Sequence, residues 1–110
     1  MFQTNPNPTF SAAVELSVPG VMQPLQVQFT FRHKGKKELS GWIAEAPQKD
    51  DASVLSEVIV GWSGMQNGKG VDVEYSFTAL ADLLDAYPAS HGEIFRTYLN
   101  ELTASKRKNL

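Results

Sequence analysis

Hydrophobic and polar residues alternate in two stretches near the start of the chain. Every second residue between positions 10 and 18 is apolar, and the same alternation returns between positions 25 and 31. A period of two places the apolar side chains of a strand on one face. Pro19 and Gly20 favour a turn after the first stretch. The pattern therefore predicts an antiparallel β-hairpin over residues 9–32 with one apolar face.

The spacing of apolar residues becomes helical after residue 35. Apolar residues at i, i+3, i+4 and i+7 predict a helix over residues 36–46, which Pro47 ends. A second helix is predicted to run from Asp50 and Asp51, whose carboxylates suit a helix start, through Ile59. The β-branched residues 58–60 leave a strand as the alternative there.

Two further helices are predicted in the last third of the chain. Ser76 suits the start of the first, and Pro88 ends it. Ser90 and Glu93 have the spacing of a capping box, in which both side chains bind backbone N–H groups at a helix start. We therefore expect an α+β fold, with an N-terminal antiparallel β-hairpin followed by about four α-helices that pack on its apolar face.

The length of 110 residues fits one domain. We expect residues 1–110 to form a single domain with a loose N-terminal arm (1–8), the hairpin (9–32), a helical part (36–105) and a frayed basic tail (106–110). The absence of cysteine and of a recognisable signal peptide fits a cytoplasmic protein. No apolar run is long enough to cross a membrane, and a net charge of −2 argues against a general nucleic-acid binder.

Residues with catalytic or ligand-binding chemistry are few and scattered. Segment 64–70 is rich in glycine, but a phosphate-binding loop needs one more residue before Gly-Lys and a Ser or Thr after it, so we expect a flexible loop. His33 and His91 have no partner at metal-ligand spacing, and adjacent Asp50 and Asp51 suit helix capping better than acid–base catalysis. The residues predict no catalytic site, cofactor or metal site, although a triad assembled from distant positions stays open.

Partner-binding surface is predicted in two segments. The first combines Trp62, Met65 and Tyr75 with glycine, and aromatic and methionine side chains are enriched at protein interfaces. Burial of Trp62 and Tyr75 beneath the loop is the alternative. The second segment is basic and comprises Lys106, Arg107 and Lys108. Its alternative is a solvated helix end, where cations interact favourably with the helix dipole.

The predicted hairpin also has exposed strand edges. Glu15 and Arg32 are the only charges on its solvent-facing positions, and Pro24 protects one end. Soluble proteins usually protect such edges with lysines, prolines or bulges. We therefore expect these edges to pair with another subunit or with a client strand. Cover by a helix or by the N-terminal arm is the alternative.

An ordered set of landmarks spans about residues 9–109. They are Val14-Glu15-Leu16-Ser17-Val18-Pro19-Gly20, Phe29-Thr30-Phe31-Arg32, Glu57-Val58-Ile59-Val60-Gly61-Trp62, Glu74-Tyr75-Ser76, Leu80, Leu83-Leu84, Tyr87-Pro88-Ala89, Ile94-Phe95 and Tyr98-Leu99-Asn100-Glu101-Leu102. In this order they resemble the tail assembly chaperones of long-tailed, siphovirus-type bacteriophages or prophages. The glycine-rich segment 64–70 departs from the pattern of that family.

The resemblance implies a protein without catalytic activity that binds another chain. Such chaperones bind the tape measure protein, a long helical chain, and keep it soluble until the major tail protein polymerises around it. The resemblance places the protein in the host bacterial cytoplasm and outside the mature virion, and we expect a homo-oligomer. A longer form made by ribosomal frameshifting would recruit the major tail protein, and Arg107-Lys108-Asn109 is compatible with a slippery site.

Two other functions stay open. The first is a structural tail protein of completion or connector type, which would remain in purified virions. The second is a small nucleic-acid-associated regulator that uses the basic residues at 32–37 and 106–108. Steeply salt-dependent DNA binding would indicate that function.

Overall fold

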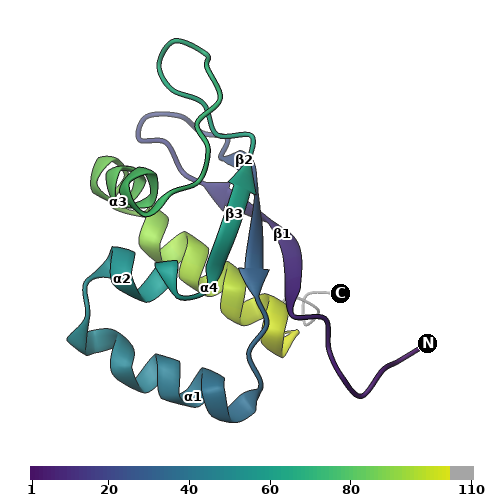
Figure 1. Ribbon diagram of the computed structural model, residues 1–110. Coiled ribbons are helices and arrows are strands. Elements are labelled where there is room, and N and C mark those ends of the chain that lie inside the picture. The colour runs from purple at the N-terminus through teal and green to yellow at the C-terminus, as the bar shows by residue number, and fades with distance from the viewer. Residues whose placement is uncertain (105–110) are drawn as a thin grey trace.

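A three-stranded antiparallel sheet organises the protein, as shown by a computed structural model that describes residues 1–104 (Figure 1). Its strands are β1 (Thr9–Leu16), β2 (Leu25–Arg32) and β3 (Ile59–Ser63), in the spatial order β1-β2-β3. β1 and β2 pair over their whole length, from Thr9 opposite Arg32 to Leu16 opposite Leu25. The predicted hairpin is confirmed.

The third strand corrects the prediction for residues 51–60. A helix through Ile59 is wrong, because α2 (Asp51–Ser56) ends first and β3 begins at Ile59. Residues 58–60 are β-branched, which suits a strand better than a helix. β3 also pairs antiparallel with the second edge of β2. The register of this pairing shifts between Thr30 and Phe31. The strand alternative was therefore the correct one.

The structure describes four α-helices: α1 (Lys36–Glu45), α2, α3 (Phe77–Ala86) and α4 (Ser90–Thr103), with a 3₁₀ turn, η1 (Ala46–Gln48), after α1. In Figure 1, α4 crosses behind the sheet, α1 and α2 lie at one end of it, and α3 lies to one side. Side chains along β1 and β2 alternate between buried and exposed. The helices thus cover one sheet face, and the predicted α+β fold is confirmed.

Two predicted helix starts are confirmed by their hydrogen bonds. The Ser76 hydroxyl accepts the backbone N–H of Ala79 at 3.0 Å and begins α3. The Asp50 carboxylate accepts the N–H of Ser53 at 2.7 Å and begins α2. The Ser53 side chain and then this backbone hydrogen bond lower the pKa of Asp50, because both stabilise the charged form.

The predicted capping box at the start of α4 is wrong. Ser90 is the first residue of the helix, and its hydroxyl donates to the backbone oxygen of Tyr87 at 2.7 Å. The Glu93 carboxylate instead accepts the backbone N–H of Ser17, at 3.0 Å to one oxygen, and also the Ser17 hydroxyl. Glu93 therefore ties α4 to the end of β1, a contact between residues too distant in sequence for local spacing to reveal.

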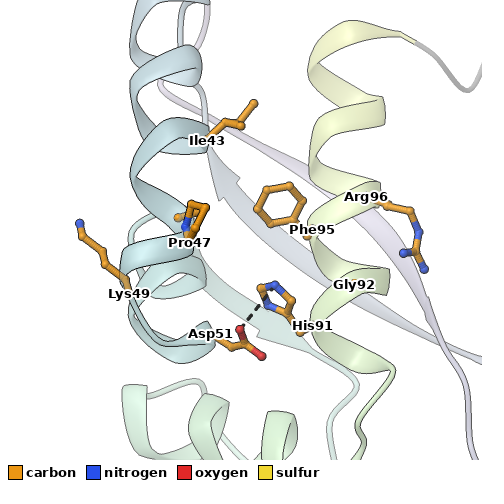
Figure 2. A pocket seen from close by; sticks show the side chains of 9 residues that line it. Ile43, Pro47, Lys49, Asp51, His91, Gly92, Phe95 and Arg96 are labelled. Carbon is orange, nitrogen blue, oxygen red and sulfur yellow. Dashed lines mark ion pairs between the residues drawn. The ribbon is translucent and has the colours of Figure 1, made fainter.

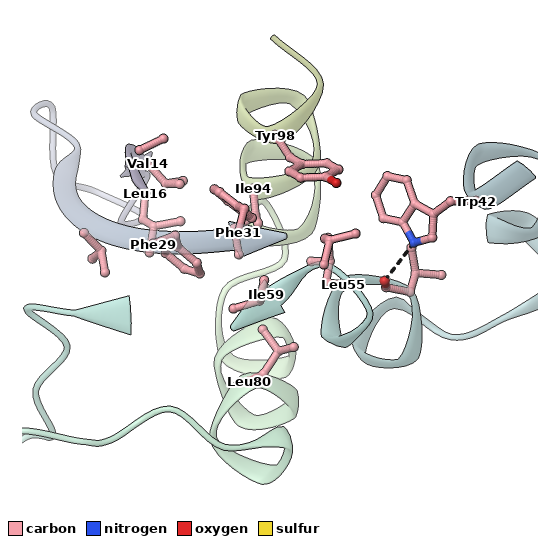
Figure 3. Close-up of a cluster of buried hydrophobic side chains, with 14 residues drawn as sticks. Val14, Leu16, Phe29, Phe31, Trp42, Leu55, Ile59, Leu80, Ile94 and Tyr98 are labelled. Carbon is pink, nitrogen blue, oxygen red and sulfur yellow. Dashed lines mark hydrogen bonds between the residues drawn. The ribbon is translucent and has the colours of Figure 1, made fainter. Parts of the chain in front are cut away.

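The hydrophobic core fills the space between the sheet and the helices (Figure 3). Its buried apolar residues are Ala12, Val14, Leu16, Val27, Phe29, Phe31, Trp42, Val54, Leu55, Val58, Ile59, Leu80, Ile94 and Tyr98. The hydroxyl of fully buried Tyr98 donates to the backbone oxygen of Arg32 at 2.7 Å. Burial raises the pKa of Tyr98 to about 12. Trp42 packs edge-to-face on Tyr98 and donates its Nε1 hydrogen to the Val54 oxygen at 3.1 Å. These contacts fix α1 and α2 against α4.

Candidate partner-binding groove

A groove of about 670 Å³, here termed the apolar groove, lies between the end of the β1–β2 hairpin, α3 and the residues that follow β3. It is lined by Leu16, Ser17, Val18, Leu25, Gln26, Val27, Trp62, Gly64, Met65, Gln66, Asn67, Val73, Ala79, Asp82, Leu83, Ala86 and Tyr87. Most of these side chains are apolar, and a few polar groups stand among them. Proteins bind ligands and partner segments in concave surfaces of this composition.

One wall of the groove is the exposed side of α3. Ser76 fixes the start of the helix, and fully buried Leu80 anchors it to the core. Ala79, Leu83 and Ala86 line the groove at spacings of four and three residues, which places them on one helix face. The two alanines keep this wall shallow, so the helix leaves space for another segment.

Trp62 connects the groove to the core. Its Nε1 hydrogen is donated to the backbone oxygen of Val73 at 2.8 Å. The indole makes edge-to-face contacts with Phe29 and Tyr75, with ring centroids 5.8 Å and 5.1 Å away. Burial raises the pKa of Tyr75, and the charge of Arg32 acts in the opposite direction. These contacts hold the indole in place, so this part of the groove is formed before any partner arrives.

The structure brings two of the predicted partner-binding residues together. Trp62 and Met65 both line the groove, and both also pack against the core. Tyr75 lies outside the lining and supports the Trp62 ring. The two interpretations of Trp62, burial and partner contact, therefore apply to different parts of one half-buried side chain.

The loop expected around residues 64–70 folds back on itself as a small hydrogen-bonded hairpin over residues 64–73. Gln66 pairs with Asp72, and the Asn67 side-chain oxygen accepts the N–H groups of Lys69 at 2.8 Å and Val71 at 3.1 Å. Gly70 has a φ of 75°, which favours glycine. Because Asn67 already occupies the amide groups that a phosphate would need, the structure gives no support to a phosphate-binding loop.

Exposed apolar side chains lie in the two segments whose ends contribute to the groove lining. In the β1–β2 connection, Val21 is 54%, Met22 96% and Leu25 61% exposed, and Val71 of the 64–73 hairpin is 57% exposed. Both segments project at the same end of the molecule (Figure 1). Sequence reasoning missed the β1–β2 connection as a partner-binding candidate. The available signal was an apolar pair in a strand connection, between Gly20 and Pro24, where polar residues are usual.

A second cavity lies between α4 and the α1–α2 connection (Figure 2). His91 faces Asp51 there, with 3.7 Å between Nε2 and Oδ1. Lys49 on the rim pairs with Glu57 at 3.1 Å and with Glu45 at 3.5 Å. The lining contains no serine, threonine or cysteine, so it offers the His91–Asp51 pair no hydroxyl or thiol to activate.

Other predicted features are distributed as follows. His33 lies beside the N-terminal arm, where its backbone N–H donates to the Pro8 oxygen at 2.9 Å. Lys106, Arg107 and Lys108 lie outside the described residues. Within residues 1–104, no cluster of histidine and carboxylate side chains is arranged to hold a metal ion. The helices of this part are also too short or too polar to span a membrane.

Comparison with known proteins assigns the chain to a family. No curated protein and no solved structure matches it at a significant level. A family model described as phage tail assembly chaperone matches residues 1–109, nearly the whole chain. This match agrees with the order of landmarks along the sequence. The chain therefore belongs to the phage tail assembly chaperone family.

Proposed function

We propose that this tail assembly chaperone binds the tape measure protein in the apolar groove and keeps it soluble while the tail tube assembles. The observation that carries the proposal is a preformed apolar groove that exposed Leu25 lines, with exposed Met22 and Val71 in the two segments whose ends contribute to the lining. Burial of these side chains against a partner would remove apolar surface from water. Exposed apolar surface next to an apolar groove usually marks an interaction site.

The groove suits the apolar face of a helix. One wall is the α3 face with Ala79, Leu83 and Ala86, and small residues let two helices approach closely. Met65 and Trp62 on the opposite side supply adaptable apolar contact. Polar groups such as Gln26 and Asp82 stand at the groove and would meet the polar side of an amphipathic client helix. Binding through apolar area alone also permits release when the tube protein takes over the client.

Co-expression with the tape measure protein of the same phage tests the proposal. Leu25→Asp combined with Met65→Asp places two charges in the groove, and we expect the client to move from the soluble to the insoluble fraction because burying an unpaired charge is costly. Val60→Asp is the matched control: Val60 is 40% exposed and does not line the groove. Equal client solubility with the groove variant and the control would contradict the proposal, provided that circular dichroism shows both variants folded.

The proposed function also implies where the protein is found. We expect the protein in the host bacterial cytoplasm during assembly and not in the mature virion. Mass spectrometry of purified particles distinguishes a chaperone from a tail component, because a structural protein would be present at a fixed ratio to the major tail protein. A slippery run at codons 107–109 would allow a longer frameshifted form that contacts the major tail protein, and the nucleotide sequence of the gene decides whether this particular site exists.

A further inference from the structure

The outer edge of β1 carries backbone groups that the fold leaves unpaired. His33 donates its N–H to the Pro8 oxygen, and Arg32 donates its own to the Val58 oxygen. Because hydrogen-bonding direction alternates along a strand, the N–H and C=O groups of residues 9, 11, 13 and 15 point away from β2. Among residues 1–104, no hydrogen bond outside the strand ladders engages these groups.

The open segment has a defined end. Ser17 is the next residue whose N–H points outward, and the Glu93 carboxylate accepts it at 3.0 Å. At the other end, Pro8 has no N–H to offer. The N-terminal arm leaves the sheet and points away from it (Figure 1). The unpaired groups therefore run from Thr9 to Glu15, and Ala12 is their midpoint.

We propose that this edge pairs with the same edge of a second copy, antiparallel, around a two-fold axis at Ala12. In this register Thr9 lies opposite Glu15 of the second copy and Ser11 opposite Ala13 of the second copy, so every outward group gains a partner. The two three-stranded sheets become one continuous sheet. β3 is a poorer edge for this purpose, because it has only 5 residues.

The side chains along the edge favour a second copy over a client strand. Ser11 and Ala13 are small and uncharged, and the one charged residue, Glu15, meets a threonine hydroxyl in the symmetric register. The cavity beside Ala13 and Glu15 is lined by charged and polar residues of α4, among them Arg96, Thr97 and Asn100. An apolar client strand would find few apolar contacts there. β1 of another copy presents small and polar side chains at this edge, so its pairing does not depend on apolar contacts.

Substitutions with charged residues at positions 11 and 13 test the proposal. In the proposed dimer, residue 11 of each copy lies opposite residue 13 of the other copy. Sedimentation of the wild-type protein should give twice the chain mass of 12.1 kDa. Ser11→Lys/Ala13→Lys and Ser11→Glu/Ala13→Glu each place like charges opposite one another, and each should be monomeric. An equimolar mixture should restore the dimer, since introduced lysines then face introduced glutamates. Restoration on mixing cannot come from misfolded chains.

Ala13→Pro provides a second test that adds no charge. The outward N–H of residue 13 is not part of the β1–β2 ladder, so proline there leaves the fold intact. We expect self-association to weaken more than about tenfold, because a symmetric pair of hydrogen bonds is lost. Ala13→Ser is the matched control and should remain dimeric. A monomeric wild-type protein, a folded Ala13→Pro dimer, or a charge mixture that stays monomeric would each overturn the proposal.

Discussion

The Glu93 carboxylate could act either in a capping box with Ser90 or in a contact with Ser17, and mutation distinguishes these two roles. In a capping box, Glu93 would act with Ser90 at the start of α4. In the structure it accepts the backbone N–H and hydroxyl of Ser17, at the end of β1. Glu93→Ala should therefore destabilise the protein by weakening the attachment of α4 to the sheet. The helix start itself should not change.

The expected loss of unfolding free energy depends on how exposed the Glu93–Ser17 contact is. Hydrogen bonds to charged groups contribute about 1.5–3 kcal/mol when shielded from water. Ser17 is exposed and Glu93 half-buried, so we expect the lower end of this range, about 1.5 kcal/mol for Glu93→Ala and about 0.5–1 kcal/mol for Ser17→Ala. At roughly 4 °C per kcal/mol for a domain of this size, thermal midpoints should fall by about 6 °C and 2–4 °C.

Two double-mutant cycles measure the partner of Glu93 directly. Urea unfolding of Ser17→Ala, Glu93→Ala and the double variant should give a coupling of about 0.5–1 kcal/mol. The corresponding cycle with Ser90→Ala should give a coupling near zero, because the Ser90 hydroxyl donates to Tyr87 instead. Coupling of Glu93 to Ser90 and none to Ser17 would refute this account of α4.

Two further predictions concern the core and the groove. Tyr98→Phe should cost about 1–3 kcal/mol in unfolding free energy, since it leaves the Arg32 oxygen without its donor. Folding raises the pKa of Tyr98 from 10.0 to about 12, so the Tyr98 hydroxyl loses its proton at lower pH in the unfolded chain than in the folded protein. The unfolding free energy of the wild-type protein should therefore decrease as pH rises through this interval. The unfolding free energy of Tyr98→Phe should decrease less. Gly70→Ala should lower the thermal midpoint by roughly 4 °C, because alanine is strained by about 1 kcal/mol at a φ of 75°. Gly68→Ala, at a position with open space and an ordinary φ, should leave the midpoint unchanged.

The sequence predicted those elements whose causes are local. Alternation between residues 10 and 31 was sufficient for the hairpin, because a strand with one buried face must repeat with period two. Ser76 and Asp50 marked helix starts, since a cap is a contact three residues along the chain. The sequence did not decide between helix and strand for β3, because five residues are too few to distinguish a helical from a strand periodicity. Pairing with the edge of β2 makes this segment a strand.

The candidate site was only half predictable for a related reason. Trp62 and Met65 were chosen for their residue type, which local composition reveals. Leu83 and Leu25 join them in the groove through packing between elements that are distant in the sequence. The role of Glu93 is hidden in the same way, because its spacing from Ser90 imitates a local motif and its actual partner is Ser17.

The two proposed surfaces use different groups of the hairpin, although both involve β1. The groove uses residues 16–18 and 25–27 at the end of the hairpin, the 64–73 hairpin and α3, whereas self-pairing uses the outward backbone groups of residues 9–15 on β1. A dimer through β1 therefore leaves both grooves open. A long client with repeated apolar segments could then occupy two grooves at once, and the second binding step would gain from a high effective concentration. Each groove could bind weakly enough to release its segment, while the dimer as a whole retained the chain.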